Sequence, residues 1–377
     1  MSLGTNPGEA GAVDRVASRP ILVMAGGTGG HVFPALAVAR VLQHRAHGVV
    51  WLGTRRGIEA RVVPAAGIST EWISVQGLRG KGVLALIAAP FRLLRALWQS
   101  LTVMAKHRPA AVLGMGGFVS GPGGVAAWLT RRPLIIHEQN AIAGLTNRLL
   151  ARLARVVLQA FPGAFSARFN AETVGNPVRE EIAALEEPAA RFAARSGPLR
   201  LLVLGGSQGA LALNRIVPEA LAKLPAERKP VVRHQSGERT LDAAREAYDR
   251  FGIEVQLEAF VEDMAAAYGW ADLVVCRAGA LTVAELAAAG VPAIFVPFPA
   301  AVDDHQTANA RPFADAGAAF ILNERDLNAE TLAALLQQWL SSREDLGARA
   351  VKARSLARPQ ALARIAELCL EVAGANA

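Results

Sequence analysis

The chain of 377 residues is long for a single domain, and its length favours two. Two cysteines are too few for a disulfide framework. The net charge of +8 comes without a lysine-rich tail or a basic run interleaved with aromatic residues, so a nucleic-acid partner is not expected. Residues 1–19 contain Glu9 and Asp14 and lack an apolar core, which predicts a loose arm rather than a signal peptide. The longest uncharged run, at 286–302, is short and broken by prolines, so we expect a soluble cytoplasmic protein.

Short runs of leucine and β-branched residues alternate along the chain with alanine-rich segments. Because these runs lack an alternation of apolar and polar residues, they predict parallel strands that helices cover on both faces. A strand, a glycine loop and a helix open the chain at residue 21, and the same order restarts at residue 199, after a polar stretch at 180–198. The expected strands of the first half are ILVMA at 21–25, GVVWLG at 48–53, AAVLGMG at 110–116, PLIIHE at 133–138 and RVVLQAF at 155–161.

This repeated order predicts an α/β fold of two Rossmann-like, doubly wound parallel-sheet domains. The expected boundaries are 20–178 for the first domain and 179–356 for the second.

Three glycine-rich loops follow predicted strands, at 26–30, 114–124 and 205–209. Glycine lets backbone amides approach a ligand closely, and the start of the next helix favours an anion. A tight turn explains any one loop equally well, but three loops in two facing domains favour two phosphorylated ligands in a cleft. Val32 stands where a dinucleotide-binding pattern needs glycine, and the pattern G-x-x-x-x-G-K-[ST] is absent, so neither a nicotinamide cofactor nor nucleoside triphosphate hydrolysis is expected.

The first glycine loop leads into His31, and a helical pattern is predicted from Ala35. Farther along, the polar residues HEQN at 137–140 stand at the end of a predicted strand. Ligands of open α/β sheets bind at strand ends, which favours a functional role for this cluster over a simple turn. Ala141 occupies the place of the second histidine of an H-E-x-x-H zinc motif, so the cluster is not expected to bind zinc.

In the second half, a strand predicted at 272–276 leads through a glycine turn to Thr282 and Glu285. One interpretation is a capping box with Thr282 as the N-cap, and a ligand at the same helix end is the other. The acidic residues and histidine at 303–305 show no separated D-x-D pattern and are read as a solvated loop, so no metal or cofactor is expected.

Seven short motifs resemble those of the MurG family of bacterial glycosyltransferases (glycosyltransferase family 28), and they occur in the family's order. The resemblance covers nearly the whole chain from about Ile21. It implies a GT-B fold, in which two Rossmann-like domains face each other across a cleft and a helix at about 357–377 packs back on the first domain. The motifs are AGGTGGHVFPALA, GLRGKG, GMGGFVSGPGG, HEQNAIAGLTNR, VGNPVR, GGSQGA and RAGALTVAEL.

The resemblance implies inverting transfer of N-acetylglucosamine from UDP-GlcNAc to the 4-hydroxyl of MurNAc in undecaprenyl-pyrophosphoryl-MurNAc-pentapeptide (lipid I), forming lipid II for peptidoglycan. It also implies a peripheral location on the cytoplasmic face of the inner membrane, with other cell-wall synthesis and division proteins as further partners. Two alternatives stay open: a glycosyltransferase of the same fold with another acceptor, and an enzyme like the UDP-GlcNAc 2-epimerase. A non-enzymatic scaffold is disfavoured by the many polar residues expected in the cleft.

By the same resemblance, the UDP-GlcNAc site is expected mainly in the second domain. Ser207 would hold the diphosphate, Val261 would present its backbone to the uracil, and Glu285 would accept hydrogen bonds from the ribose. Further donor contacts are expected from Asn140, Arg179, Ala280, Leu281, Thr282, Val283, Ala284 and Gln306. Phe118 stands where many relatives have tyrosine, and His305 where some have glutamine, so a shared role of either side chain is in doubt.

The glycine loop at 26–30 would then face the donor domain and cradle the acceptor diphosphate or the donor sugar. His31 would stand beside the acceptor hydroxyl as the general base, because an imidazole accepts protons near neutral pH. The alternative is that His31 only orients the loop or donates to a phosphate. Glu138 and His137 are the reserve candidates for the base. The loop residues expected nearest the substrates are Thr28, Gly29 and Gly30.

The segment at 77–104 carries two apolar stripes, although only one can pack on the domain core. We expect the other, with its flanking cations, to meet anionic lipid headgroups; a helix buried beneath the C-terminal helix is the alternative. The expected membrane stripe is Leu84, Ile87, Phe91, Leu94 and Trp98, and the flanking cations are Arg79, Lys81, Arg92 and Arg95.

Overall fold

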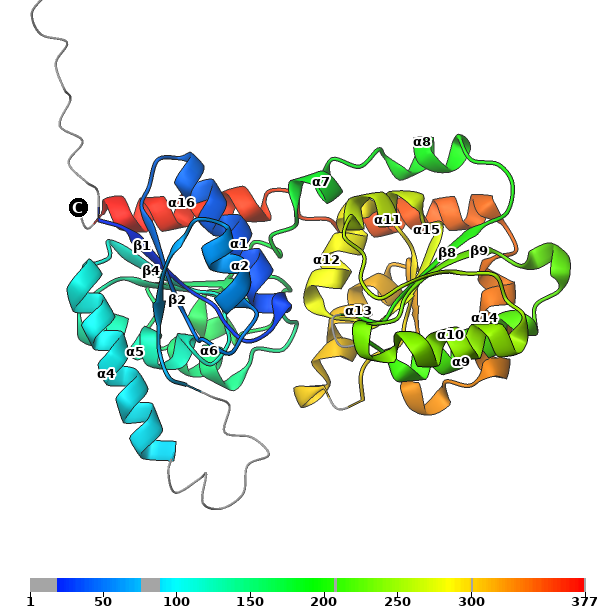
Figure 1. The fold of residues 1–377 in the computed structure, drawn as a ribbon. Helices are drawn as coiled ribbons and strands as arrows, with labels where there is room; N and C mark the ends of the chain where they lie inside the picture. The colour runs from blue at the N-terminus through cyan, green and yellow to red at the C-terminus, as the bar shows by residue number, and fades with distance from the viewer. Residues whose placement is uncertain (1–18, 76–88, 207–208, 300, 376–377) are drawn as a thin grey trace, which may run out of the picture.

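The computed structural model describes residues 19–75, 89–206, 209–299 and 301–375, which form two α/β lobes side by side (Figure 1). Within these residues, seven parallel strands form the first sheet, in the order β3-β2-β1-β4-β5-β6-β7. Six parallel strands form the second sheet, in the order β10-β9-β8-β11-β12-β13. The chain starts near the centre of each sheet and winds outward to both edges, so the predicted doubly wound α/β architecture is confirmed.

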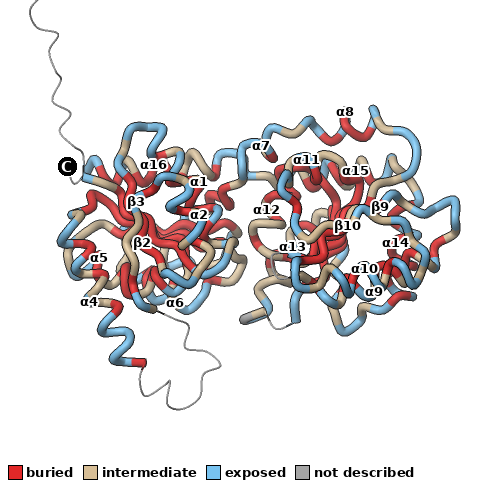
Figure 2. The backbone as a smooth tube through the Cα atoms, viewed as in Figure 1, coloured by how far each residue is buried: buried red, intermediate tan, exposed pale blue. Residues whose placement is uncertain are grey.

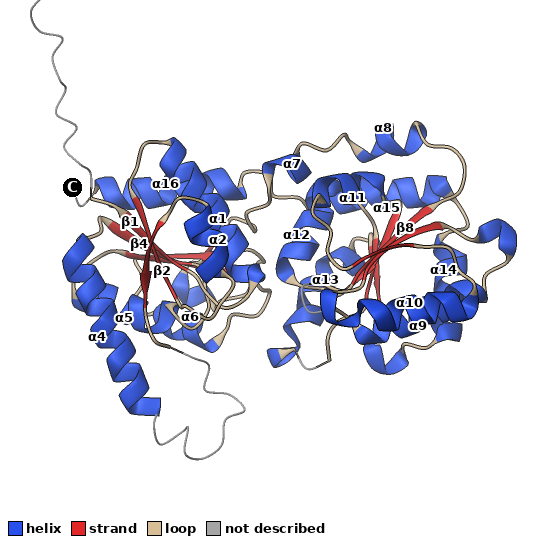
Figure 3. Ribbon diagram, in the orientation of Figure 1, coloured by secondary structure: helices blue, strands red, loops and turns tan. Residues whose placement is uncertain are grey.

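Helices cover both faces of each sheet, and the strands are the most deeply buried parts of the lobes (Figure 2, Figure 3). All four residues of β1 (Ile21–Met24) are buried, as the uninterrupted apolar sequence ILVM predicts. The other strands of the first sheet are β2 (Val49–Gly53), β3 (Ser69–Trp72), β4 (Ala111–Gly114), β5 (Leu134–Glu138), β6 (Val156–Gln159) and β7 (Glu172–Thr173). Those of the second sheet are β8 (Arg200–Leu204), β9 (Val231–Gln235), β10 (Gln256–Glu258), β11 (Leu273–Cys276), β12 (Ala293–Phe295) and β13 (Ala319–Ile321).

The helices lie between successive strands, as parallel pairing of the strands requires. In the first lobe they are α1 (Gly29–His44), α2 (Glu59–Ala65), α4 (Ala89–His107), α5 (Ser120–Leu129) and α6 (Leu145–Leu150). The segment between the sheets holds α7 (Glu180–Ala183) and α8 (Pro188–Ala193). The remaining helices are α9 (Leu211–Ala222), α10 (Leu241–Phe251), α11 (Met264–Trp270), α12 (Ala280–Ala289), α13 (His305–Asp315), α14 (Ala329–Trp339), α15 (Arg343–Ser355) and α16 (Ala361–Gly374).

Helix α16 returns to the first lobe and packs against α1 and β4, where Figure 1 draws it beside the blue start of the chain. Its residues Ile365, Cys369 and Val372 are buried in the same apolar cluster as the side chains of β1. The chain therefore passes between the lobes twice, at 174–179 and at 356–360.

Helix α1 begins earlier than predicted, at Gly29 instead of Ala35, with Thr28 as its N-cap. Residues 29–34 show no helical pattern in the sequence, because they include two glycines and Pro34, which lacks an amide hydrogen. Burial of the apolar face of α1 against the sheet stabilises the helix despite the one missing hydrogen bond. His31 consequently lies within the first turn of the helix.

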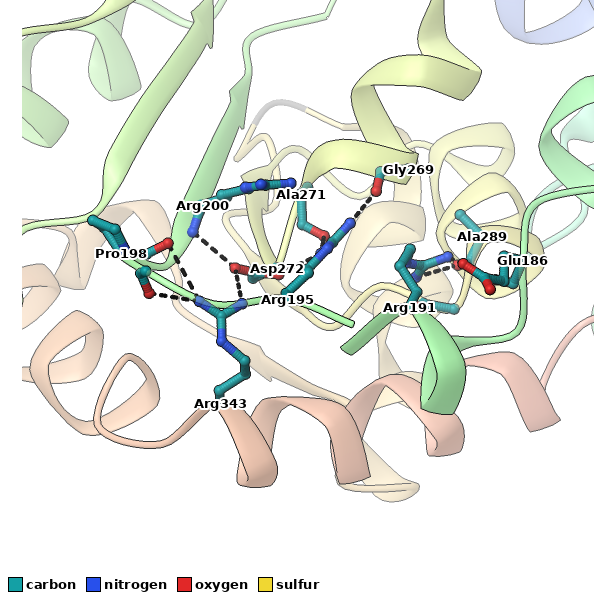
Figure 4. Close-up of polar contacts among 12 residues, drawn as sticks. Glu186, Arg191, Arg195, Pro198, Arg200, Gly269, Ala271, Asp272, Ala289 and Arg343 are labelled. Atoms are coloured by element: carbon teal, nitrogen blue, oxygen red, sulfur yellow. Dashed lines mark hydrogen bonds and ion pairs between the residues drawn. The ribbon is translucent and has the colours of Figure 1, made fainter. Parts of the chain in front are cut away.

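A buried carboxylate joins distant parts of the second lobe (Figure 4). Asp272, directly before β11, is fully buried and pairs with the guanidinium of Arg195. Its Oδ2 accepts hydrogen bonds from Arg343 Nη1 and from the Arg200 amide, both at 3.0 Å. Burial lowers the pKa of Arg195, and the charge of Asp272 opposes that shift. The carboxylate thus ties the entry segment and α15 to the sheet.

We expect Asp272→Asn to lower the free energy of unfolding by about 3–5 kcal/mol, because it leaves the buried Arg195 guanidinium without its counter-charge. Urea unfolding of the full chain, followed by fluorescence, measures the change. The control is Glu330→Gln, which removes the partner of Lys223 at the surface and should leave the midpoint unchanged. Equal midpoints for the two variants would contradict the role given to Asp272.

Candidate active site

A cavity of about 420 Å³ lies between the lobes. Residues that follow β8, β10 and β11 line it from the second lobe, and Phe33, Pro34 and Ala37 of α1 line it from the first. Ligands of parallel α/β sheets bind at the carboxyl ends of the strands, so this cavity is the candidate site for a nucleotide.

The glycine loop after β1 is held by Glu59, whose role the sequence analysis missed. The fully buried carboxylate accepts hydrogen bonds from the Gly27 amide at 3.0 Å and from the amide and hydroxyl of Thr54 at 3.0 and 2.8 Å. A Cβ at Gly57 would overlap Glu59 Oε2, so the close approach requires glycine there. The loop therefore has a fixed shape, and the amides of Gly29 and Gly30 start a helix without intrahelical acceptors.

His31 is partly exposed, and its ring lies between two polar loops of the first lobe. Its Nδ1 is 3.0 Å from Gln139 Oε1. A Cβ at Gly116 would lie 2.6 Å from the same nitrogen, so the loop after β4 needs glycine to admit the ring. Among the described residues, Nε2 of His31 has no hydrogen-bond partner, which leaves this nitrogen for a substrate.

The two reserve candidates for the base are the last two residues of β5, and both are enclosed by protein. His137 is fully buried, and its Nε2 donates to the Gly175 carbonyl at 2.9 Å. Burial lowers the pKa of His137 to about 4, so the ring is neutral at pH 7. Glu138 is 3% exposed, and its two oxygens accept hydrogen bonds from Asn140, Gly144 and Asn147. This geometry gives both side chains a positioning role.

Asn140, expected to contact the donor, lies against the second lobe. Its Oδ1 accepts from Asn309 Nδ2 at 3.2 Å, and the Ala141 amide donates to Asn309 Oδ1 at 2.8 Å. Asn176 makes a second bridge: its Nδ2 is 3.0 Å from the Gln139 carbonyl and 3.3 Å from the carbonyl of Ala280. Asn309 and Asn176 were missed because their partners come from far along the sequence.

In the second lobe, Glu285 is 5% exposed and lines the cavity. Its Oε1 accepts from Arg179 Nη2 at 2.8 Å, and its Oε2 accepts from the Tyr268 hydroxyl at 3.1 Å. Burial raises the pKa of Glu285, whereas the neighbouring Arg179 opposes that rise. The capping-box interpretation is wrong, because α12 begins at Ala280 with Gly279, not Thr282, as the N-cap.

The other residues expected at the donor site lie in several places, and Ala280 is the first residue of α12. Val261, Leu281 and Thr282 line the cavity together with Arg179 and Glu285. Gln306 lies beside it, and its Oε1 accepts from the amides of Ala278 at 3.2 Å and Phe298 at 2.9 Å. Ser207 is outside the described residues.

Val283 and Ala284, also expected at the donor site, do not line this cavity. They border a second cavity of about 760 Å³, on another face of α12, beside the segment at 175–178. The cause is the helical period, which turns neighbouring residues to different sides.

Helix α4 presents an exposed apolar stripe, and Figure 2 shows the exposed stretch of this helix. Phe91, Leu94 and Trp98 are 75%, 62% and 66% exposed, and Arg92 and Arg95 beside them are also exposed. The opposite face packs on the lobe through Ala96, Ser100, Val103 and Met104. The expected stripe residues Leu84 and Ile87 and the cations Arg79 and Lys81 lie outside the described residues.

Two absences apply to the described part of the chain. No helix there is long and apolar enough to cross a membrane. No group of three or more His, Cys, Asp or Glu side chains there could hold a metal ion.

Comparisons with known proteins give the family. The glycosyltransferase family 28 N-terminal domain matches residues 21–159, and the C-terminal domain of that family matches residues 200–365. The UDP-N-acetylglucosamine--N-acetylmuramyl-(pentapeptide) pyrophosphoryl-undecaprenol N-acetylglucosamine transferase of Alkalilimnicola ehrlichii is 64% identical over 94% of this chain and 99% of its own. The protein of the same name from Marinobacter nauticus is 55% identical over 94% of this chain and 98% of its own.

Solved structures agree with this assignment. The crystal structure of Acinetobacter baumannii MurG superposes with a TM-score of 0.82 at 44% identity, covering 94% of this chain and 99% of that one. The UDP-GlcNAc 2-epimerase of Neisseria meningitidis superposes with a TM-score of 0.64 at 13% identity over 93% of this chain and 99% of its own, which indicates a shared fold only. The expected GT-B fold and the resemblance are therefore confirmed, and the chain belongs to glycosyltransferase family 28.

Proposed function

We propose that the chain transfers N-acetylglucosamine from UDP-GlcNAc to the 4-hydroxyl of MurNAc in lipid I and thereby forms lipid II. The observation that carries this proposal is the interlobe cavity, which combines a buried carboxylate, a guanidinium and a helix N-terminus on the donor side. Helix α1, which carries His31 in its first turn, lines the other side through Phe33, Pro34 and Ala37. Relatives at 54–64% identity that bear the name of this transferase support the choice of substrates.

On the donor side, the domain at 179–356 binds UDP-GlcNAc. The apolar wall at Phe260 and Val261 suits the flat uracil ring, and Glu285 has lone pairs left for the ribose hydroxyls. The amides of Ala280, Leu281 and Thr282 open helix α12 and stabilise the negative charge that develops on the departing diphosphate.

On the acceptor side, the domain at 20–178, completed by the helix at about 357–377, holds lipid I. The amides of Thr28, Gly29 and Gly30 bind its diphosphate, since backbone amides at the start of a helix favour an anion. The hydrogen bond from the Gly27 amide to Glu59 holds this loop in the required shape. His31 Nε2 takes the proton from the attacking 4-hydroxyl, and the oxygen displaces UDP from the anomeric carbon with inversion. His137 and Glu138 are unsuited to this step, since both are enclosed by protein.

The proposal is tested by incubating the protein with radiolabelled UDP-GlcNAc and lipid I. We expect the label to enter the lipid phase. In the same assay, His31→Gln should lower turnover by roughly 10²–10⁴-fold and abolish the acidic limb of the pH–rate profile, because the base is lost. An acidic limb that survives while only acceptor affinity falls would make His31 a binding residue. Label that stays with the nucleotide as an epimerised sugar would instead favour the epimerase alternative.

Glu285→Ala should raise the Michaelis constant for UDP-GlcNAc by an amount that corresponds to about 1–3 kcal/mol, because hydrogen bonds to a charged group are lost. Titration calorimetry with UDP separates nucleotide binding from catalysis. Tyr268→Phe is the matched control, since it removes one neighbour of Glu285 and leaves the carboxylate in place. Unchanged UDP affinity with a lower melting temperature in Glu285→Ala would assign this residue a structural role only.

We further propose that the protein lies on the cytoplasmic face of the inner membrane through α4, where lipid I presents its headgroup, within reach of other cell-wall synthesis and division proteins. The exposed aromatic and aliphatic side chains would enter the interface, and Arg92 and Arg95 would meet anionic headgroups.

Replacing Phe91 and Trp98 by alanine should abolish sedimentation with anionic vesicles, because apolar burial supplies the anchoring. Arg92→Gln with Arg95→Gln should remove the preference for anionic over neutral vesicles. Phe320→Ala is the control, since Phe320 is exposed on β13 of the other lobe. Equal binding of all three variants would exclude α4 as the contact surface.

A further inference from the structure

A chain of hydrogen bonds leads from the segment between the lobes to His31. The Gly175 carbonyl is 2.9 Å from His137 Nε2. On the other side of that ring, His137 Nδ1 is 3.2 Å from Gln139 Nε2, which also donates to the Met115 carbonyl at 2.8 Å. The chain ends where Gln139 Oε1 lies 3.0 Å from His31 Nδ1.

The Gly175 carbonyl, at the start of this series, determines which nitrogen carries the proton in His137 and then in His31. A carbonyl oxygen only accepts, so the Gly175 carbonyl requires the proton of His137 on Nε2. The ring is neutral at pH 7, since burial lowers the pKa of His137 to about 4, and its Nδ1 is therefore an acceptor. The amide nitrogen of Gln139 must face this acceptor and the Met115 carbonyl, which turns Oε1 toward His31. Only an N–H can donate to that oxygen.

We infer that Gln139 is a positioning residue that holds His31 in the Nδ1–H tautomer and leaves Nε2 as the proton acceptor. The inference rests on the base role proposed above for His31. With the opposite tautomer, His31 would present an N–H to the acceptor hydroxyl and could take no proton from it. Gln139 is 2% exposed, so it acts through His31 and not on the substrate itself.

The position of Gln139 is itself fixed by the segment between the lobes. The Asn176 side chain donates to the Gln139 carbonyl at 3.0 Å, next to the Gly175 carbonyl that orients His137. Gly175 has a φ of +90°, and a Cβ there would overlap the Cβ of Arg358 in the second crossing. The two segments that connect the lobes, 174–179 and 356–360, therefore contact each other at Gly175, where the series of hydrogen bonds begins.

Nitrogen NMR of the full chain, labelled at histidine, reads the tautomers directly. Above the titration range of the rings, we expect a protonated Nδ1 in His31 and a protonated Nε2 in His137. The spectrum of His31→Gln identifies the His31 signals by their loss. A protonated Nε2 in His31, or a protonated Nδ1 in His137, would overturn the inference without any variant of Gln139.

Gln139→Met keeps the side-chain volume similar but removes the polar contacts with His31, His137 and the Met115 carbonyl. His31 should then populate both tautomers, and kcat should fall by about 10–10²-fold, less than on losing the base, with the Michaelis constant for UDP-GlcNAc unchanged. Gln139→Glu restores an acceptor for His31 Nδ1–H and should restore that tautomer. An unchanged His31 tautomer in Gln139→Met would show that Gln139 does not set it. If the tautomers are as expected but His31→Gln retains full turnover, the base role fails and the tautomer assignment stands.

Discussion

The position of the two lobes relative to each other depends on side-chain amides that form hydrogen bonds across the cleft. Asn176 donates to one backbone carbonyl at the end of β5 and to another at the start of α12, and Asn309 joins the same two regions from the opposite side. Both asparagines are buried, so a displacement of the lobes would leave polar groups unsatisfied at a cost of about 1–3 kcal/mol each. These contacts hold the start of α12 and the residues Phe33, Pro34 and Ala37 of α1 at one cavity.

The same constraint explains why HEQN is polar and yet enclosed. In a sequence, a histidine and a glutamate at a strand end indicate acid–base chemistry. Here His137 and Glu138 instead orient Gln139, Asn140 and the loop that follows, each through several hydrogen bonds. Burial removes the water that would compete for these bonds, which strengthens them and holds the side chains in place. The partly exposed imidazole of His31 is the outer end of this network.

Much of the architecture could be predicted from the sequence because it rests on local patterns. Uninterrupted apolar runs predicted the strands β1, β2, β4, β5 and β6, and the glycine loops marked the carboxyl ends of β1, β4 and β8. Contacts between distant residues could not be predicted in this way. Glu59, Tyr268 and Asn309 each pair with groups far along the chain, and no local pattern marks a carboxylate, a phenol or an amide as buried. Local rules also failed at the starts of two helices. Helix α1 begins at Gly29, six residues before the pattern at Ala35, and α12 begins after Gly279 rather than after Thr282.

The return of α16 to the first lobe has a consequence for synthesis on the ribosome. Ile365, Cys369 and Val372 complete the apolar cluster around β1, so part of this core is made only after the entire second lobe. Domains commonly fold in the order in which they emerge, N-terminal first. In this chain the first lobe is completed last. When all strands and helices of the second lobe have been synthesised, the first lobe still exposes the apolar surface of α1 and β4 that α16 later covers. The nascent first lobe therefore keeps this apolar surface exposed until α16 has been synthesised.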